Sequence, residues 1–330
     1  MTFVLEIISR KKVMNHTYKL ETEVAEILPE IAKQNVTISK PERGDWKTLR
    51  DNGNAGWRTW ANAAPNYPDV KRKSFFAKTQ DGAFIELRWY AKEGQQPNSA
   101  VVYAHGGGMV LGSLDLYDFV VAEYVSKSGV PFLAVGYRLA PESKGTRLAE
   151  DVFTGISWLI AHASELEVDC NRIAVMGDSG GGAPAAGATI MARDRHISLA
   201  RQILIYPMLD DRNLTPDTFL LPFLTWTYDD NYTAWSAVLG SDIATETVSP
   251  VVAPARLRNF VDLAPAYIEV GELDIFRDED ISYAQQLFKA GIAVELHVHS
   301  GAPHGYDRIA TNAKLTQRAM NDRIRIIQSI

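Results

Sequence analysis

One serine, Ser179, lies in a pattern that constrains the local backbone more than any other part of the chain. Residues 177–181 read Gly-Asp-Ser-Gly-Gly, after the apolar run 172–176 and before the small-residue segment 182–192. A strand, a sharp turn at a serine and a helix in this order form a nucleophile elbow with a strained serine backbone. Side chains in place of Gly177 or Gly181 would collide with the crossing strand or helix. The pattern therefore predicts a nucleophilic serine.

A phosphate-binding turn is the alternative for such a glycine-rich stretch. No lysine follows in the arrangement of a P-loop, which disfavours this alternative. The chain of 330 residues has a net charge of −6, which gives no attraction for nucleic acid or an anionic membrane. Its one cysteine, Cys170, cannot form an intramolecular disulfide, so a reducing compartment is compatible with the sequence.

The N-terminal apolar stretch, residues 2–9, does not have the order of a secretory signal. Glu6 interrupts it, and the basic pair Lys11-Lys12 follows it rather than precedes it. No apolar run approaches the ~20 residues that a membrane span needs. We therefore expect a soluble, cytoplasmic protein without stable membrane insertion.

Strand and helix candidates alternate along most of the chain. Two alternating runs, 74–80 and 83–90, flank Asp81-Gly82, which is a hairpin signal. Continuous apolar runs then indicate strands buried on both faces of a parallel sheet. We predict a mostly parallel eight-stranded sheet that is entered by an antiparallel hairpin and has helices on both faces. The remaining strand candidates are 100–104, 131–135, 173–176, 202–206, 266–270 and 292–299, and the helix candidates are 114–127, 148–163, 182–193, 279–290 and 311–327.

The stretch 209–265 interrupts this alternation. It contains no parallel-strand pattern and is rich in aromatic residues and prolines. A connection this long is usually a lid or a binding loop, and this one starts directly after a strand. A packing segment without substrate contact is the alternative. We select Phe223, Trp226 and Tyr228 as candidate substrate contacts within it.

A serine nucleophile needs a base, and the base needs an acid that orients it. Where a nucleophile elbow is used in this way, the acid and then the histidine follow the serine in the chain. His304 lies in a loop after the last predicted strand and is the candidate base. His297 and His299 fall inside that strand.

Two acids directly follow the strand 266–270. Functional residues are expected just after strands, because ligands bind outside the carboxyl ends of parallel strands. Glu272 and Asp274 both satisfy this rule, which cannot separate them, whereas Asp262 precedes the strand and lies at its wrong end.

The sequence His105-Gly106-Gly107-Gly108 follows another strand candidate. Three glycines leave backbone N–H groups uncovered, and such loops supply oxyanion donors in lipases and esterases. The N–H of Gly180 can complete the set. We expect His105 to support the loop rather than to transfer protons.

With both motifs identified, the chain resembles the hormone-sensitive-lipase-like (bacterial family IV type) carboxylesterases, which have the α/β-hydrolase fold. The likeness implies Asp274 as the acid and the amides of Gly106, Gly107 and Gly180 as the oxyanion hole. It implies a cap formed by about 1–65 and about 209–260 on a single domain, 1–330. The shared motifs are His105-Gly106-Gly107-Gly108, Tyr137-Arg138-Leu139-Ala140-Pro141-Glu142, Gly177-Asp178-Ser179, Tyr206-Pro207, Ser249-Pro250, Leu273-Asp274, Arg277-Asp278 and Pro303-His304-Gly305.

The resemblance also implies an activity: hydrolysis of short- to medium-chain acyl or aryl esters, without a cofactor or metal. It further implies a possible homodimer through the last strand and helix. An acyltransferase, thioesterase or amidase with the same triad is the alternative, and a ligand receptor of this fold is disfavoured because His304 is present. A lipase acting at interfaces is another alternative, although the chain has no long apolar surface helix.

Two positions depart from the family pattern. Gly180 replaces the usual alanine after the nucleophile, and Ala183-Pro184 replaces the usual asparagine region. The Gly180 amide survives, and a proline near a helix start is tolerable because the N–H that it removes has no partner in the helix. The effect of Gly180 on the elbow is left open by the sequence.

Overall fold

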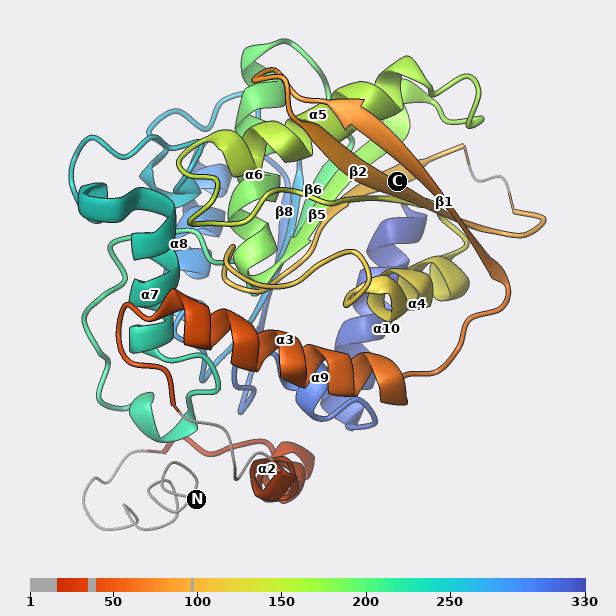
Figure 1. Cartoon of the computed structure of the whole chain (residues 1–330). Helices are drawn as coiled ribbons and strands as arrows, with labels where there is room; N and C mark the ends of the chain where they lie inside the picture. The colour runs from red at the N-terminus through yellow and green to blue at the C-terminus, as the bar shows by residue number, and fades with distance from the viewer. Residues whose placement is uncertain (1–16, 35–39, 96–97) are drawn as a thin grey trace.

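The computed structural model describes residues 17–34, 40–95 and 98–330. Its centre is a twisted eight-stranded sheet in the order β1-β2-β4-β3-β5-β6-β7-β8 (Figure 1). β2 pairs antiparallel with both β1 and β4, and every other neighbouring pair is parallel. The predicted mostly parallel sheet with an antiparallel hairpin is thereby confirmed. The strands are β1 (Val70–Lys78), β2 (Phe84–Lys92), β3 (Ala100–Ala104), β4 (Phe132–Val135), β5 (Ile173–Asp178), β6 (Arg201–Ile205), β7 (Ala266–Gly271) and β8 (Val294–His299).

Helices cover both faces of the sheet, as predicted. α4 and α10 pack together on one face, and α5 and α6 pack together on the other (Figure 1). α8 contacts β7 and β8. The helices are α2 (Thr22–Gln34), α3 (Trp46–Ala63), α4 (Asp118–Ser128), α5 (Arg147–Ala161), α6 (Gly182–Asp194), α7 (Tyr228–Leu239), α8 (Arg277–Lys289), α9 (Tyr306–Ile309) and α10 (Lys314–Gln328).

The central strands are buried because their sequences are apolar at consecutive positions. Every residue of β3, β4, β5 and β7 is buried, as expected for parallel strands covered on two faces. α6 is buried from its first residue to Ala192, and its glycines and alanines allow this close packing. A Cβ on Gly187, for example, would lie 2.9 Å from Ala149 of α5. The helix that follows the elbow is therefore fixed at the centre of the molecule.

The two segments predicted to form a cap contain helices and no strand among their described residues. α3 of the first segment contacts α7 of the second (Figure 1). Residues 1–16 and 35–39 of the first segment lie outside the described residues. The division into a single domain and a cap stays a prediction.

The last strand, β8, lies at one end of the sheet order and pairs only with β7 among the described strands. The homodimer expected through β8 and α10 stays a prediction. Within the described residues, no helix combines the length and apolar character that crossing a membrane requires.

Candidate active site

Ser179 lies at a tight turn between β5 and α6. Its φ is 53°, in the left-handed region that residues other than glycine rarely adopt. A Cβ on Gly177 would overlap the carbonyl oxygen of Gly181, and a Cβ on Gly181 would overlap that of Ala104. Both flanking glycines are therefore required by close backbone approaches. The strained serine backbone is held by its surroundings, as is common at functional sites.

Ser179, His304 and Asp274 form one chain of hydrogen bonds. The Ser179 hydroxyl lies 2.8 Å from His304 Nε2, and His304 Nδ1 lies 2.7 Å from Asp274 Oδ2. Asp274 is fully buried, and its other oxygen accepts the N–H of Phe276 at 3.0 Å. An ionised carboxylate only accepts hydrogen bonds, so the proton between these two side chains belongs on Nδ1. Nε2 is then the acceptor that faces the serine.

Glu272, the other acid that follows β7, is oriented differently. Its Oε2 accepts hydrogen bonds from Ser300 Oγ and from the N–H of Gly301, each at 2.9 Å. These contacts hold the turn that leads from β8 toward His304. The two carboxylates left open by the strand-end rule therefore differ in their partners, and Asp274 is the one that contacts the histidine.

The His304 ring is enclosed by side chains that were not among the predicted site residues. Tyr206, the residue after β6, and Phe276 each present an edge contact, with ring centroids 4.8 and 5.1 Å from that of His304. Thr225 donates a hydrogen bond from its hydroxyl to the His304 carbonyl oxygen at 2.6 Å. The segment 209–260 thus reaches the candidate base directly.

The glycine loop that follows β3 has left-handed backbone angles at Gly107 and Gly108, with φ of 109° and 56°. Among the residues that the structure describes, none accepts a hydrogen bond from the N–H groups of Gly106, Gly107 or Gly180. The carbonyl of Gly107, by contrast, accepts N–H bonds from both Val110 and Leu111 at 3.0 Å. Uncommitted donors beside a serine are the arrangement that an oxyanion hole requires.

Buried groups beneath this loop support it. His105 is buried between the rings of Tyr117 and Tyr137, and its Nδ1 lies 2.8 Å from the carbonyl oxygen of Gly106. Burial lowers the pKa of His105 to about 4, only partly opposed by that hydrogen bond, so the ring is neutral at pH 7. This position agrees with the supporting role predicted for His105.

Asp178, next to the nucleophile, is also buried near the loop. It accepts a short hydrogen bond from the Tyr103 hydroxyl, and a Cβ on Gly106 would lie 3.1 Å from its Oδ2. Burial raises the pKa of Asp178 to about 6, although the Tyr103 hydrogen bond opposes that rise. Asp178 therefore packs beneath the glycine loop and does not join the Ser179–His304–Asp274 chain.

The three candidate substrate contacts lie in different settings. Trp226 packs against the glycine loop, because a Cβ on Gly108 would lie 2.6 Å from its Cη2. Tyr228 is the first residue of α7 and is buried, and its hydroxyl accepts the N–H of Asp217 at 3.0 Å. Phe223 is half-buried at the end of the short 3-10 helix Leu221–Phe223. Trp226 is thus the one that contacts the glycine loop.

A buried network of charged groups ties the His304 loop to β7 and α10. Arg323 is fully buried and bonds Glu269 at 3.1 Å through Nε and Asp307 at 2.6 Å through Nη1. Asp307 also accepts the Tyr206 hydroxyl at 2.8 Å. Burial alone would raise the pKa values of Glu269 and Asp307, but Arg323 and the other groups that face each carboxylate together outweigh it and lower both. The two carboxylates are therefore ionised at neutral pH.

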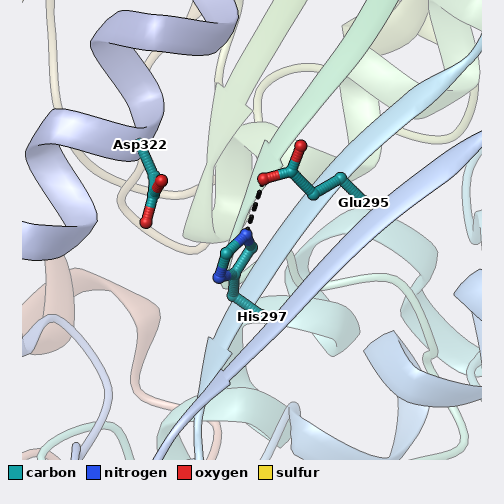
Figure 2. Close-up of side chains that lie close together, drawn as sticks. All are labelled: Glu295, His297 and Asp322. Atoms are coloured by element: carbon teal, nitrogen blue, oxygen red, sulfur yellow. Dashed lines mark hydrogen bonds and ion pairs between the residues drawn. The ribbon is translucent and has the colours of Figure 1, made fainter.

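A second polar cluster lies away from the serine, between β8 and α10. One ligand atom each from Glu295, His297 and Asp322 lies within 4.8 Å of the others, and His297 Nε2 is 2.7 Å from Glu295 (Figure 2). The Arg325 guanidinium donates to Glu295 and, at 3.2 Å, to Asp322. This guanidinium is a cation that already pairs with both carboxylates, so the cluster is explained as an ion-paired surface network.

Comparison with known proteins identifies the family. A family model described as the alpha/beta hydrolase fold matches residues 101–308, well over half of the chain. The chain belongs to this family. It is a hormone-sensitive-lipase-like (bacterial family IV type) member, as its motifs predicted, and a carboxylic-ester hydrolase.

Relatives and solved structures agree with this assignment. An ethyl acetate hydrolase from Pseudomonas putida is 33% identical over 246 residues, covering 71% of this chain and 74% of its own length. A carboxylesterase from Mycobacterium tuberculosis is 36% identical over 214 residues, covering 64% of this chain and 67% of its own. A bacterial heroin esterase superimposes with a TM-score of 0.85 at 29% identity, covering 94% of this chain and 98% of its own.

Proposed function

We propose that this esterase works through Ser179, His304 and Asp274, with an acyl-enzyme intermediate, on short- to medium-chain acyl or aryl esters. The observation that carries the proposal is the unbroken pair of hydrogen bonds from the Ser179 hydroxyl through His304 to buried Asp274. This sequence of nucleophile, base and orienting acid is the one that acyl transfer requires.

In the acylation step, Ser179 Oγ attacks the ester carbonyl carbon while its proton passes to His304 Nε2. The carbonyl oxygen becomes an oxyanion that accepts the N–H groups of Gly106, Gly107 and Gly180. Collapse of the tetrahedral intermediate breaks the bond to the leaving alkoxide, which takes the proton from Nε2. Asp274 keeps the Nδ1 proton in place and stabilises the imidazolium that forms transiently.

In the deacylation step, water replaces the alcohol. His304 Nε2 takes a proton from water as the water oxygen attacks the acyl carbon, and the same three amides donate hydrogen bonds to the second oxyanion. The proton returns to Ser179 Oγ as the acyl bond breaks, which releases the carboxylic acid and restores the enzyme. Each oxyanion donor of this kind contributes about 2.7–4 kcal/mol to transition-state stability.

The surroundings of the serine favour a neutral, small or medium acyl group. The segment that contacts His304 carries Phe223, which offers apolar rather than charged surface. The relative from Pseudomonas putida is named an ethyl acetate hydrolase, which supports a short acyl chain for the substrate of this protein. We therefore propose highest kcat/KM for acetyl to hexanoyl esters within a p-nitrophenyl series.

The proposal is tested with Ser179→Ala and p-nitrophenyl butyrate. We expect kcat to fall about 10⁶-fold, to the level left by the oxyanion hole alone, with an unchanged thermal melting curve. Retained turnover in a folded variant would remove Ser179 from the mechanism. Adding thioester, amide and alcohol-acceptor substrates to the panel separates hydrolysis from thioesterase, amidase and acyltransferase activity by the same residues.

A further inference from the structure

The glycine loop 106–108 has almost no freedom on the side that faces the nucleophile elbow. A Cβ on Gly180 would overlap the backbone N and Cα of Gly108 and would lie 2.6 Å from the N of Met109. Real Cβ atoms essentially never approach backbone atoms so closely, so an alanine at 180 would force the loop or the elbow to move. Gly180 therefore does more than fit the turn of the elbow. The loop occupies the space that a side chain at position 180 would need.

The loop is also bounded by the segment 209–260. The Trp226 ring stands where a side chain on Gly108 would be, at 2.6 and 2.7 Å from such a Cβ, and Ala234 of α7 would lie at 3.3 Å from it. Gly108 is thus in contact with the elbow through its backbone and with the indole on the side where a side chain would stand. Trp226 Nε1 is buried and has no hydrogen-bond partner among the described residues, so the contact is one of packing.

Hydrogen bonds hold the loop at its two ends and through the carbonyl groups of Gly106 and Gly107, but not through the N–H groups of these two glycines. The Tyr137 hydroxyl donates to the carbonyl oxygen of His105 at 2.7 Å, and Met109 accepts the N–H of Ala140 at 2.9 Å. Between them, the N–H groups of Gly106 and Gly107 donate to no described residue. Packing, not hydrogen bonding of these amides, therefore sets where the donors point.

We propose that Gly180 and Trp226 together hold the oxyanion loop in place, so that Trp226 is a positioning residue that acts on kcat rather than a substrate contact that acts on KM. This inference rests on the proposed oxyanion role of the loop and goes beyond it. It also assigns a role to the glycine that replaces the family's alanine: in this chain, restoring alanine impairs the enzyme.

The test is a double-mutant cycle with Gly180→Ala and Trp226→Leu, assayed on p-nitrophenyl acetate, whose acyl group is too small to require a distant contact. Gly180→Ala is expected to lower kcat about 10²-fold, because a displacement of about 1 Å at a reacting centre has this effect. Trp226→Leu is expected to lower kcat about 10-fold and to change KM less than about 2-fold, because only the loop's support is lost.

The double variant distinguishes a shared mechanism from two separate ones. Because either change frees the same loop, its kcat should stay near that of Gly180→Ala, about 10² below wild type. A fall of about 10³-fold, the product of the single effects, would contradict the proposal. So would wild-type kcat in Gly180→Ala, or a raised KM with unchanged kcat in Trp226→Leu.

Stability gives a readout that does not depend on catalysis. Gly180→Ala should lower Tm by about 4 °C or more, and Trp226→Leu should offset part of that loss by making room for the loop. If Ser179→Ala kept its activity, the proposed function would fail, but the Tm values would still test whether Gly180 and Trp226 hold the same loop. Additive Tm changes in the double variant would contradict this further inference. Gly56→Ala in α3, where a Cβ meets nothing within 4 Å, is the matched control: it should keep wild-type kcat and should not lower Tm, because alanine is more favourable than glycine inside a helix.

Discussion

The proposed catalytic chain and the ion network beside it both contain buried charges, but only the network pairs every charge with an opposite one. Ser179, His304 and Asp274 form an open chain: its carboxylate is fully buried and its serine is only half-buried. Glu269, Asp307 and Arg323 form a closed set in which each charge has an opposite partner. A hydrogen-bonded chain that ends at an accessible serine can pass a proton to a substrate. A set of charges that are all paired with one another only holds the elements that carry them in place. The same buried ionic chemistry thus serves reaction in one region and support in the other.

The largest contrast concerns the two carboxylates that follow β7. Asp274→Asn should lower kcat about 10⁴-fold, because an amide favours the wrong His304 tautomer. Glu272→Gln is the matched control. It removes only the charge of a side chain that accepts hydrogen bonds from Ser300 and Gly301, so it should change kcat less than about 3-fold. Steady-state kinetics on p-nitrophenyl butyrate check both, and the reverse ranking would assign the acid to Glu272.

Breaking the closed network should affect folding more than chemistry. Arg323→Met removes the guanidinium that buried Glu269 and Asp307 share, although Asp307 keeps its longer pair with Arg308 at 3.6 Å, and should cost about 3–5 kcal/mol of unfolding free energy. Arg325→Met on the same helix removes an exposed pair with Glu295 and should cost less than about 1 kcal/mol. Urea denaturation measures both, and equal losses would show that burial does not distinguish the two arginines.

Asp178 should make the free energy of unfolding decrease as pH rises, whereas a salt-bridged acid makes it increase. Its pKa is raised to about 6 by burial, so between pH ~4 and ~6 the folded protein holds a proton that the unfolded chain releases. The stability from this group is present below pH ~4 and is lost as pH rises through about 6. Asp178→Asn should therefore gain about 2 kcal/mol relative to wild type between pH 4 and 7. Parallel stability curves for the two proteins would contradict the assignment.

Apart from the control variants, the smallest change in stability is expected at Tyr206, which contacts both His304 and the buried ion network. Tyr206 has a φ of 37°, packs edge-on against His304 and donates its hydroxyl to Asp307. Tyr206→Phe keeps the ring and removes the hydroxyl, so unfolding free energy should fall by about 1.5 kcal/mol and kcat by less than about 3-fold. A far larger loss of kcat would mean that the network tunes the histidine rather than only holding its loop.

The sequence predicted the Ser179–His304–Asp274 chain better than the buried ion network of Glu269, Asp307 and Arg323, for physical reasons. Ser179 and the glycine loop carry local patterns, because tight turns and close backbone approaches restrict which residues fit. Strand and helix candidates matched the structure to within a few residues, although β1 begins at Val70 rather than at 74. The cap boundaries and the homodimer stay predictions.

Arg323, Glu269 and Asp307 carry no such signal. From the sequence alone, a charged residue in a strand or helix is expected to be exposed unless its partner is known. Because these three residues are separated in the chain, the sequence gives no indication that they pair. Thr225 and Tyr206 were missed in the same way, because their contacts with His304 depend on how the segments pack. The one hint in the sequence was that Glu269 is the only charged residue of the otherwise apolar run 266–271.

The most direct test of the central claim is covalent labelling with diethyl p-nitrophenyl phosphate. This reagent transfers its phosphoryl group to an activated serine and releases p-nitrophenol. We predict one equivalent of p-nitrophenol per chain, complete loss of esterase activity, and a single modified peptide with the adduct on Ser179. No burst from Ser179→Ala is expected. An adduct on another residue, or full inactivation without modification of Ser179, would contradict the account.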